Sequence, residues 1–194
     1  MVDINPKVIV GTWERGYALD VHTTSSRVVY DDRGRKTFEN TYSPMGDLVN
    51  RLKYRGDRSA ATDIIETAVR FLSPRRANVD VIVPAPWSTE RPFQPVDLIA
   101  DGIGAALHIP VARCISTTRA PTALKGVDAP ELRARAVDGL YAVTAAMVAG
   151  KRVLLIDDVY RSGTTLNAVT SVLLDVAKVA KVYALTMTWT RTSR

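Results

Sequence analysis

Two adjacent carboxylates followed by a hydroxyl-rich turn are the residues of this chain best suited to chemistry. Asp157 and Asp158 follow four apolar residues, 153–156. An apolar run of this length predicts a strand buried on both faces, with the acidic pair at its carboxyl end. Neighbouring carboxylates at such a place repel one another unless they accept hydrogen bonds from vicinal hydroxyls or lie near a divalent cation. The pair therefore indicates a polar ligand at the end of a strand.

The next five residues have the composition of a phosphate-binding turn. They are Arg161, Ser162, Gly163, Thr164 and Thr165, and they open a predicted helix over 164–176. Glycine permits a tight turn, successive N–H groups can converge on a phosphate, and the hydroxyls add donors at the positive end of the helix dipole. The whole segment predicts a cradle in which the acidic pair binds ribose hydroxyls and the turn binds a 5′-phosphate. A solvated turn followed by an ordinary helix cap stays open as the alternative.

Two other acidic or phosphate-binding motifs fit the chain poorly. The acidic pair of a response-regulator receiver domain ends its first strand, whereas only 36 residues follow Asp158 here. A P-loop nucleotide binder requires G-x-x-x-x-G-K-[ST], which does not occur.

Strands and helices should alternate around this segment. Strands are expected over 79–83, 111–115, 153–156 and 181–188, and helices over 58–72, 95–107, 129–137 and 164–176. This alternation predicts an α/β fold with a largely parallel sheet flanked by helices. Ligands of such sheets bind at the carboxyl ends of the strands.

The amino-terminal region reads differently. Short strands are expected over 7–10, 17–21, 27–30 and 36–40, and Asp31-Asp32-Arg33-Gly34 is a hairpin signal. Residues 1–57 are therefore predicted to form a small β-rich hood or cap on an α/β core of residues 58–194.

Composition limits the classes of function. The 194 residues are 46% hydrophobic and 24% charged, no apolar run is long enough to span a membrane, and a cytoplasmic protein is expected. One cysteine, Cys114, and two histidines cannot supply a zinc site of the usual kinds, and the cysteine is expected to be buried. A net charge of +6 suits an anionic ligand. The basic residues are scattered, which favours a small polyanion over nucleic acid without excluding the latter.

Residues 153–165, VLLIDDVYRSGTT, resemble the thirteen-residue 5-phosphoribosyl-1-pyrophosphate (PRPP) motif of type I phosphoribosyltransferases. Further stretches resemble the ComF family of predicted phosphoribosyltransferases in the order in which that family has them. They are L-K-Y-R-G-D at 52–57, V-P-A-P at 83–86, R-P-F-Q at 91–94, and Arg133 followed by G-L-Y at 139–141.

The resemblance implies roles for particular residues. Asp157 and Asp158 would hold the ribose, and through ribose or water a Mg²⁺ ion, while residues 161–165 hold the 5′-phosphate. The pyrophosphate would lie against the backbone amides of Ala85, Pro86, Trp87 and Ser88. A purely structural role for this turn stays open, and Trp87 is expected to pack partly buried. Arg119 and Lys125, in a stretch corresponding to the family's flexible loop, would neutralise pyrophosphate charge, with a solvated loop as the alternative.

The chain also departs from that family. Its four-cysteine zinc module is absent, and Pro92, Gln94, Lys125 and Ala136 replace family residues. The expected function is transfer of a phosphoribosyl group from PRPP to a nitrogenous, nucleobase-like acceptor with release of pyrophosphate. The alternative is a non-catalytic PRPP or nucleotide sensor, or an accessory protein in DNA uptake. The acceptor base is not specified, and a homodimer is left open.

Overall fold

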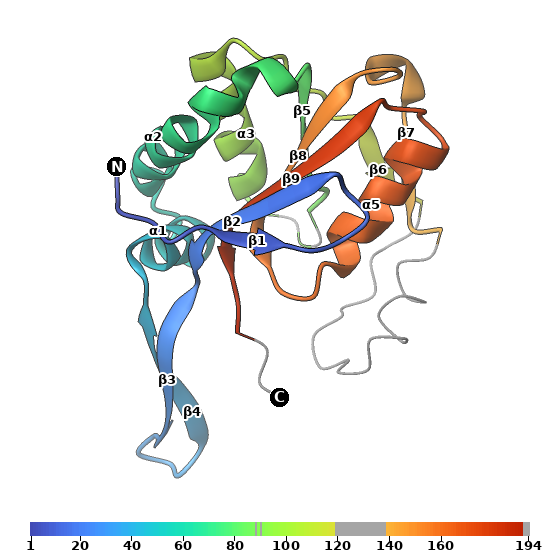
Figure 1. Ribbon diagram of the computed structural model, residues 1–194. Coiled ribbons are helices and arrows are strands. Elements are labelled where there is room, and N and C mark those ends of the chain that lie inside the picture. The colour runs from blue at the N-terminus through green and yellow to red at the C-terminus, as the bar shows by residue number, and fades with distance from the viewer. Residues whose placement is uncertain (88, 90, 119–138, 192–194) are drawn as a thin grey trace.

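A five-stranded sheet forms the centre of the protein, in a computed structural model that describes residues 1–87, 89, 91–118 and 139–191. Its strand order is β1-β2-β9-β8-β5 (Figure 1). The bounds are β1 Lys7–Ile9, β2 Arg15–Val21, β5 Val81–Pro84, β8 Arg152–Tyr160 and β9 Lys181–Trp189. β1 is antiparallel to β2, and all the other neighbours are parallel. The predicted α/β fold with a largely parallel sheet is confirmed.

Helices cover both faces of this sheet, which explains the apolar runs in its strands. Leu154 and Ile156 of β8 pack into one core with α1 (Pro44–Tyr54), α2 (Ala60–Leu72) and α3 (Pro95–Leu107). Val153 and Leu155 point the other way, into a second core with α5 (Thr164–Asp175). Successive side chains of a strand alternate between faces, so a strand covered on both sides must be apolar at every position.

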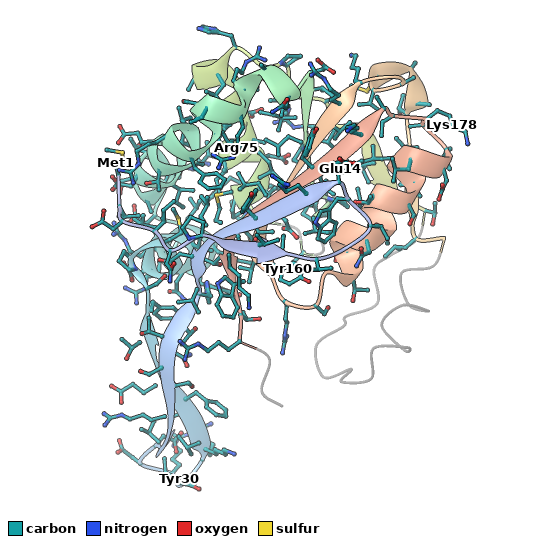
Figure 2. All side chains as sticks on the ribbon, viewed as in Figure 1. Met1, Glu14, Tyr30, Arg75, Tyr160 and Lys178 are labelled. Carbon is teal, nitrogen blue, oxygen red and sulfur yellow. The ribbon has the colours of Figure 1, made fainter. Side chains whose placement is uncertain are left out.

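The amino-terminal β region divides between the central sheet and a separate hairpin. β1 and β2 belong to the central sheet, whereas β3 (Thr23–Tyr30) and β4 (Lys36–Tyr42) pair only with each other. The hairpin projects from the rest of the molecule, with Tyr30 at its far end (Figure 2). Its turn is the predicted one, with Gly34 at φ 72°. A division at residue 57 stays a prediction, but β1 and β2 are core strands and not part of a separate cap.

Helix α1 was not expected in this region. Ser43 accepts a hydrogen bond from the Gly46 N–H at 3.0 Å, and a proline occupies the first helical turn. Both features are helix-start signals, although Pro44 and Gly46 also suggest a turn. Gly46 is required here because a Cβ atom would lie 2.0 Å from the carbonyl oxygen of His22. The helix is therefore pressed against the end of β2.

The smaller elements differ from the expectation. The strand predicted over 111–115 is wrong: β6 covers Ile115–Thr117 and pairs with β7 (Tyr141–Val143) in a separate two-stranded sheet. Val111 makes only an isolated bridge to Ile82, so the apolar character of that segment reflects packing.

Short 3-10 helices, η1 and η2, cover Ser73–Asn78 and Ala145–Met147. The helix predicted over 129–137 lies outside the described residues. Among those that are described, no helix is long and apolar enough to cross a membrane.

Candidate functional site

The predicted site lies at one edge of the central sheet. Since β2, β5, β8 and β9 run parallel, their carboxyl ends meet at the same edge. This edge gathers His22 after β2, Ala85 after β5, the acidic pair near the end of β8 and Thr188 near the end of β9. It is the place where ligands of parallel sheets bind.

The acidic pair lies within β8 and not beyond it, which corrects the predicted strand end at residue 156. β8 continues to Tyr160, and Asp157 lies opposite Thr186 in the ladder with β9. Adjacent residues of a strand point to opposite faces. Asp158 accordingly shares the face of α1, whereas Asp157 shares the face of α5. The two side chains thus leave β8 toward different helices, while the charge of Asp158 still acts on Asp157.

Asp158 forms a buried ion pair with Lys53. Lys53 Nζ lies 2.6 Å from Asp158 Oδ2, and the two side chains are 19% and 11% exposed. Burial by itself lowers the pKa of the Lys53 ammonium, but the charge and hydrogen bond of Asp158 outweigh it, so that the pKa is raised. The lysine is therefore charged at neutral pH and offsets the cost of burying Asp158.

The last turn of α1 places Lys53 at this edge. Just beyond the helix, Gly56 adopts φ 68°, and the Asp57 N–H bonds to the Arg51 carbonyl at 3.2 Å. The Asp57 carboxylate accepts hydrogen bonds from Ser59 and from the Arg51 guanidinium, and these two partners lower its pKa to about 2. The L-K-Y-R-G-D segment thus ends the helix and holds its lysine toward β8.

Asp157 has a different environment. Burial, followed by the negative charge of Asp158, raises its pKa to about 7. Its Oδ1 accepts the Asp158 N–H at 2.8 Å. On the same side lies Tyr141, whose phenol pKa is raised, mainly by burial. A hydrogen bond with Thr165 opposes this rise, and the charge of Asp157 adds to it. A carboxyl group with this pKa can accept a hydrogen bond from a ligand hydroxyl or hold a proton near neutral pH.

A polar chain links the ends of β2, β8 and β9. His22 Nδ1 lies 3.0 Å from Thr188 Oγ1, and this hydroxyl also donates to the Asp158 carbonyl at 3.3 Å. The imidazole meets the Tyr42 ring edge-on at 5.4 Å between centroids. Burial, more than the nearby charges of Asp158 and Lys53, lowers the pKa of His22. The ring is therefore neutral at neutral pH and acts as a hydrogen-bonding group.

The predicted phosphate cradle has the geometry of an open helix start. Gly163 caps α5 at φ 74°, and no side chain in the described part of the chain caps the helix. Its first N–H groups therefore point outward without intrahelical partners. Ser162 Oγ and Thr164 Oγ1 lie 2.9 Å apart, and Arg161 and Ser162 are exposed. This arrangement can bind an anion through backbone and hydroxyl donors.

The segment between β1 and β2 supports this cradle. Tyr160 donates its hydroxyl to the Val10 carbonyl at 3.1 Å, and the Thr12 N–H donates to Asn167 Oδ1 at 2.9 Å. Trp13 packs edge-on against Tyr160, with ring centroids 6.4 Å apart. The amino-terminal strands therefore hold both ends of the 160–167 segment.

The turn after β5 needs a correction. The Ala85 N–H donates to the Ile156 carbonyl at 2.8 Å, and Pro86 has no N–H, so neither residue can offer an amide to a pyrophosphate. Trp87 is 51% exposed, so about half of its surface is open to a ligand. Ser88, Arg119 and Lys125 lie outside the described residues. Of the part of the predicted turn that the structure describes, the Trp87 amide and indole are the groups that could contact a ligand.

Three groups at this edge were not predicted as site residues: Lys53, His22 and Thr188. Lys53 lay in the L-K-Y-R-G-D stretch, but spacing along the sequence does not connect residue 53 to residue 158. His22 and Thr188 follow or end strands that run parallel to β8, a relation that needs the strand order. Cys114 is buried, as predicted.

Comparison with models of known protein families finds one match, in the carboxyl-terminal part of the chain. Residues 117–190 match the phosphoribosyl transferase domain. A comparison with curated protein sequences finds no significant match.

Comparison with solved structures finds similar proteins. The allosteric regulatory enzyme of purine biosynthesis superposes with a TM-score of 0.50 at 18% identity, over 88% of this chain and 37% of that one. Orotate phosphoribosyltransferase from Aeropyrum pernix gives 0.46 at 16% identity, over 82% and 71% of the two chains. Adenine phosphoribosyltransferase from Saccharomyces cerevisiae, complexed with adenine and an imino-altritol bisphosphate, gives 0.44 at 12% identity, over 83% of each. The chain thus shares its α/β fold with the enzyme of purine biosynthesis and contains, over residues 117–190, a region that matches the phosphoribosyl transferase domain.

Proposed function

We propose that the protein binds PRPP at the carboxyl edge of its sheet and transfers the phosphoribosyl group to a nitrogenous acceptor, releasing pyrophosphate. The observation that carries the proposal is that one buried strand, β8, brings a carboxyl group, Asp157, and an uncapped helix start, that of α5, to the same face of the sheet. A ribose 5-phosphate presents both kinds of group that these residues can bind, hydroxyls and a phosphate. The match of residues 117–190 to the phosphoribosyl transferase domain supports the same ligand.

Each group has a proposed task. Asp157 accepts hydrogen bonds from the ribose hydroxyls, and residues 161–165 bind the 5′-phosphate. Asp158 acts through its ion pair with Lys53, which fixes the end of β8 and keeps a positive charge near the site. The pyrophosphate lies near Trp87 and Ser88, and Arg119 and Lys125 neutralise its charge, as the ComF-like motifs imply.

The chemistry would be a substitution at C1 of the ribose. The bond from C1 to the pyrophosphate oxygen breaks, positive charge develops at C1, and a nitrogen lone pair of the acceptor forms the new bond. The protein contributes position and charge, because pyrophosphate leaves with its own bonding electrons and needs only neutralisation. No covalent enzyme intermediate is required.

The donor set suits a Mg²⁺ ion held mostly by substrate oxygens. Among the described residues there is no cluster of three or more acidic, histidine or cysteine side chains that could enclose a metal. Mg²⁺ retains several waters and binds through one or two carboxylates together with substrate phosphates. Asp157 offers such a carboxylate, directly or through water, whereas Asp158 is engaged by Lys53. The ion would neutralise the pyrophosphate as it leaves.

Pyrophosphate release tests the proposal. The full chain is incubated with PRPP, Mg²⁺ and a panel of nucleobases, beside the double variant Asp157→Asn/Asp158→Asn and a control, Asp175→Asn, at the exposed far end of α5. We expect release with at least one base, a loss of at least a hundredfold in the double variant, and no change in the control. Equal rates in the wild type and the double variant would overturn the assignment.

A PRPP or nucleotide sensor is the second candidate, favoured by Lys125 in place of the usual glutamine of the flexible loop. Calorimetry with PRPP and Mg²⁺ separates the two functions. A sensor binds PRPP and releases no pyrophosphate with any base, whereas an enzyme does both. A role in DNA uptake would instead appear as affinity for DNA that falls steeply with added salt.

A further inference from the structure

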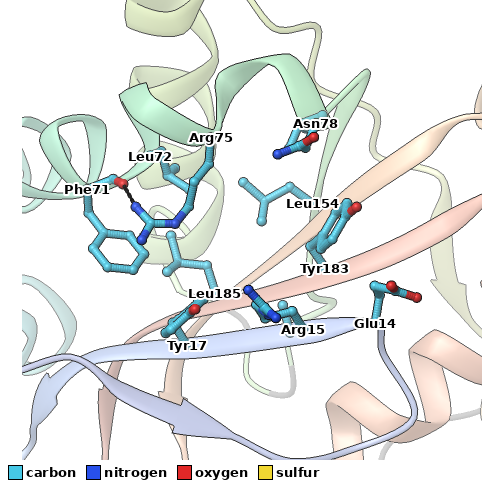
Figure 3. A pocket seen from close by; sticks show the side chains of 12 residues that line it. Glu14, Arg15, Tyr17, Phe71, Leu72, Arg75, Asn78, Leu154, Tyr183 and Leu185 are labelled. Carbon is cyan, nitrogen blue, oxygen red and sulfur yellow. Dashed lines mark hydrogen bonds between the residues drawn. The ribbon is translucent and has the colours of Figure 1, made fainter.

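A cavity lies away from the candidate site, at the other end of the sheet. Its volume is about 270 Å³, and it is enclosed by the first halves of β2 and β9, by β8 and by the turn from α2 into η1. Figure 3 shows side chains from all of these elements converging on it. Of the residues assigned to PRPP, none that the structure describes lines it.

The inner surface of this cavity is apolar and aromatic. Leu154 and Leu185 are core residues, 3% and 1% exposed, and form part of its floor. Tyr17 and Phe71 meet edge-on at 5.3 Å between centroids and form one side, and Tyr183 lies on another. Such a surface can bind a flat ring, because burial of the ring's apolar area is favourable and aromatic rings pack well edge-to-face or offset.

Two guanidinium groups stand at the rim. Arg75 lies over the Phe71 ring, with its Cζ 4.4 Å from the centroid, and Nη1 donates to the Phe71 carbonyl at 2.7 Å. This leaves its other N–H groups for a ligand. Arg15 forms no ion pair with any residue that the structure describes, and its side chain also points toward the cavity (Figure 3). Stacking holds the Arg75 fork in place before a ligand arrives.

The other polar side chains that line the cavity do not neutralise the charges of Arg15 and Arg75. Glu14 also lines the cavity, but its carboxylate is paired with Lys181 at 3.3 Å. Asn78 lines it as a neutral amide able to donate. Two positive charges over a low-dielectric floor repel one another and attract an anion more strongly than they would in bulk water.

We infer that this cavity binds a small planar anion, a single aromatic or heteroaromatic ring that carries a carboxylate or phosphate. The ring would lie on Leu154 and Leu185 between Tyr17 and Tyr183, and the anionic group would accept hydrogen bonds from Arg15 and Arg75. A volume of about 270 Å³ fits one substituted ring and not a dinucleotide. The inference stands apart from the proposed transferase function, because it uses other residues and another end of the sheet.

Phenyl phosphate is a suitable probe, with inorganic phosphate as the anion without a ring and phenol as the ring without the charge. The uniformly ¹⁵N-labelled full chain is titrated and followed by amide chemical shifts. We expect phenyl phosphate to shift the amides of Arg15, Tyr17, Tyr183 and Leu185, and both single-feature probes to bind at least tenfold more weakly. Shifts confined to residues 157–165 would mean that the probe occupies the phosphate cradle, and would overturn the inference.

Variants then test the two guanidiniums. Arg15→Gln and Arg75→Gln should each weaken phenyl phosphate binding about tenfold, the size expected for one charge-assisted hydrogen bond. Arg33→Gln, at the exposed tip of the hairpin, removes the same charge far from the cavity and should leave the affinity unchanged. Arg75 also packs on Phe71, so Arg75→Gln changes packing as well as charge. Arg15 is exposed at the start of β2, so Arg15→Gln removes the charge without removing a core contact and is the decisive variant. Unchanged affinity in a folded Arg15→Gln protein contradicts the assignment.

Discussion

The ion pair between Lys53 and Asp158 is the clearest single interaction at the site. We expect Lys53→Met to lower the free energy of unfolding by on the order of 2–3 kcal/mol, because it leaves a mostly buried carboxylate without its partner. The double variant Lys53→Met/Asp158→Asn should recover much of that loss. Urea unfolding of the two variants gives both values.

The matched control is a lysine in an exposed pair. Lys181 lies 3.3 Å from Glu14, and the two side chains are 47% and 54% exposed. Lys181→Met should change the free energy of unfolding by less than about 1 kcal/mol, because such pairs are well solvated. A similar loss for both lysine variants would show that the buried pair has no special importance.

Asp157 should make stability depend on pH. Its pKa is raised from 3.8 to about 7, so the folded protein binds a proton that the unfolded chain has already released. The free energy of unfolding should therefore fall as the pH rises from about 4 to about 7 and then level off, by a few kcal/mol at most. Asp157→Asn lacks this decline and should be the more stable protein at pH 8. Unfolding curves at pH 5 and pH 8 measure the difference.

The control for this pH effect is Asp175→Asn, which changes an exposed carboxylate on α5. Its stability should follow that of the wild type at both pH values. If the stability of Asp157→Asn also follows that of the wild type at both pH values, Asp157 is ionised from pH 5 to pH 8 and its pKa is not raised.

At the scale of elements, the start of α5 depends on the left-handed conformation of Gly163. A Cβ atom there would lie 3.0 Å from a ring carbon of Tyr160 and 3.3 Å from the Asn167 amide nitrogen. Gly163→Ala should cost about 1–3 kcal/mol of stability, because it adds crowding to the strain of a positive φ. It should also weaken PRPP binding at least tenfold, as measured by calorimetry.

Gly150 is the control that separates crowding of the new Cβ atom from backbone strain. It also has a positive φ, 69°, but a Cβ atom there would meet nothing within 4 Å. Gly150→Ala should lose about 1 kcal/mol from backbone strain alone and bind PRPP normally. Normal PRPP binding by Gly163→Ala would argue against the cradle.

On the scale of the whole molecule, the amino-terminal strands and the α/β region should fold together. The fragment 58–194 lacks β2, which pairs with β9, and α1, which supplies Lys53 to Asp158. We expect this fragment to be largely unfolded, because β9 and the core face covered by α1 become exposed to water. Circular dichroism and amide hydrogen exchange test this.

Deletion of the projecting hairpin is the control for removal of the amino-terminal strands. Replacing residues 25–40 with a two-residue Asn-Gly turn removes mostly exposed side chains and should leave the fold intact. A folded fragment 58–194 would instead support the predicted division at residue 57.

Much of the site could be predicted because it is continuous along the chain. Buried apolar residues, two carboxylates and a glycine before a helix follow one another in 153–165, and each local preference acts over a few residues. The strand end at residue 156 was placed too early, because the pairing of β9 with Val159 and Tyr160 extends β8 through the acidic pair. Composition does not reveal that pairing.

The sequence by itself determined the α/β class and the glycine-started helix after the acidic pair, and from these it predicts an anion-binding turn at a strand end. Only the tertiary structure decided which distant groups complete the site. The parallel order of β2, β9 and β8 brings His22 and Thr188 to the acidic pair, and the close packing of α1 on β2 brings Lys53 to Asp158. It also separated the two carboxylates onto opposite faces of the sheet. Local propensity reflects contacts between near neighbours, whereas these arrangements depend on contacts between residues that lie far apart in the sequence.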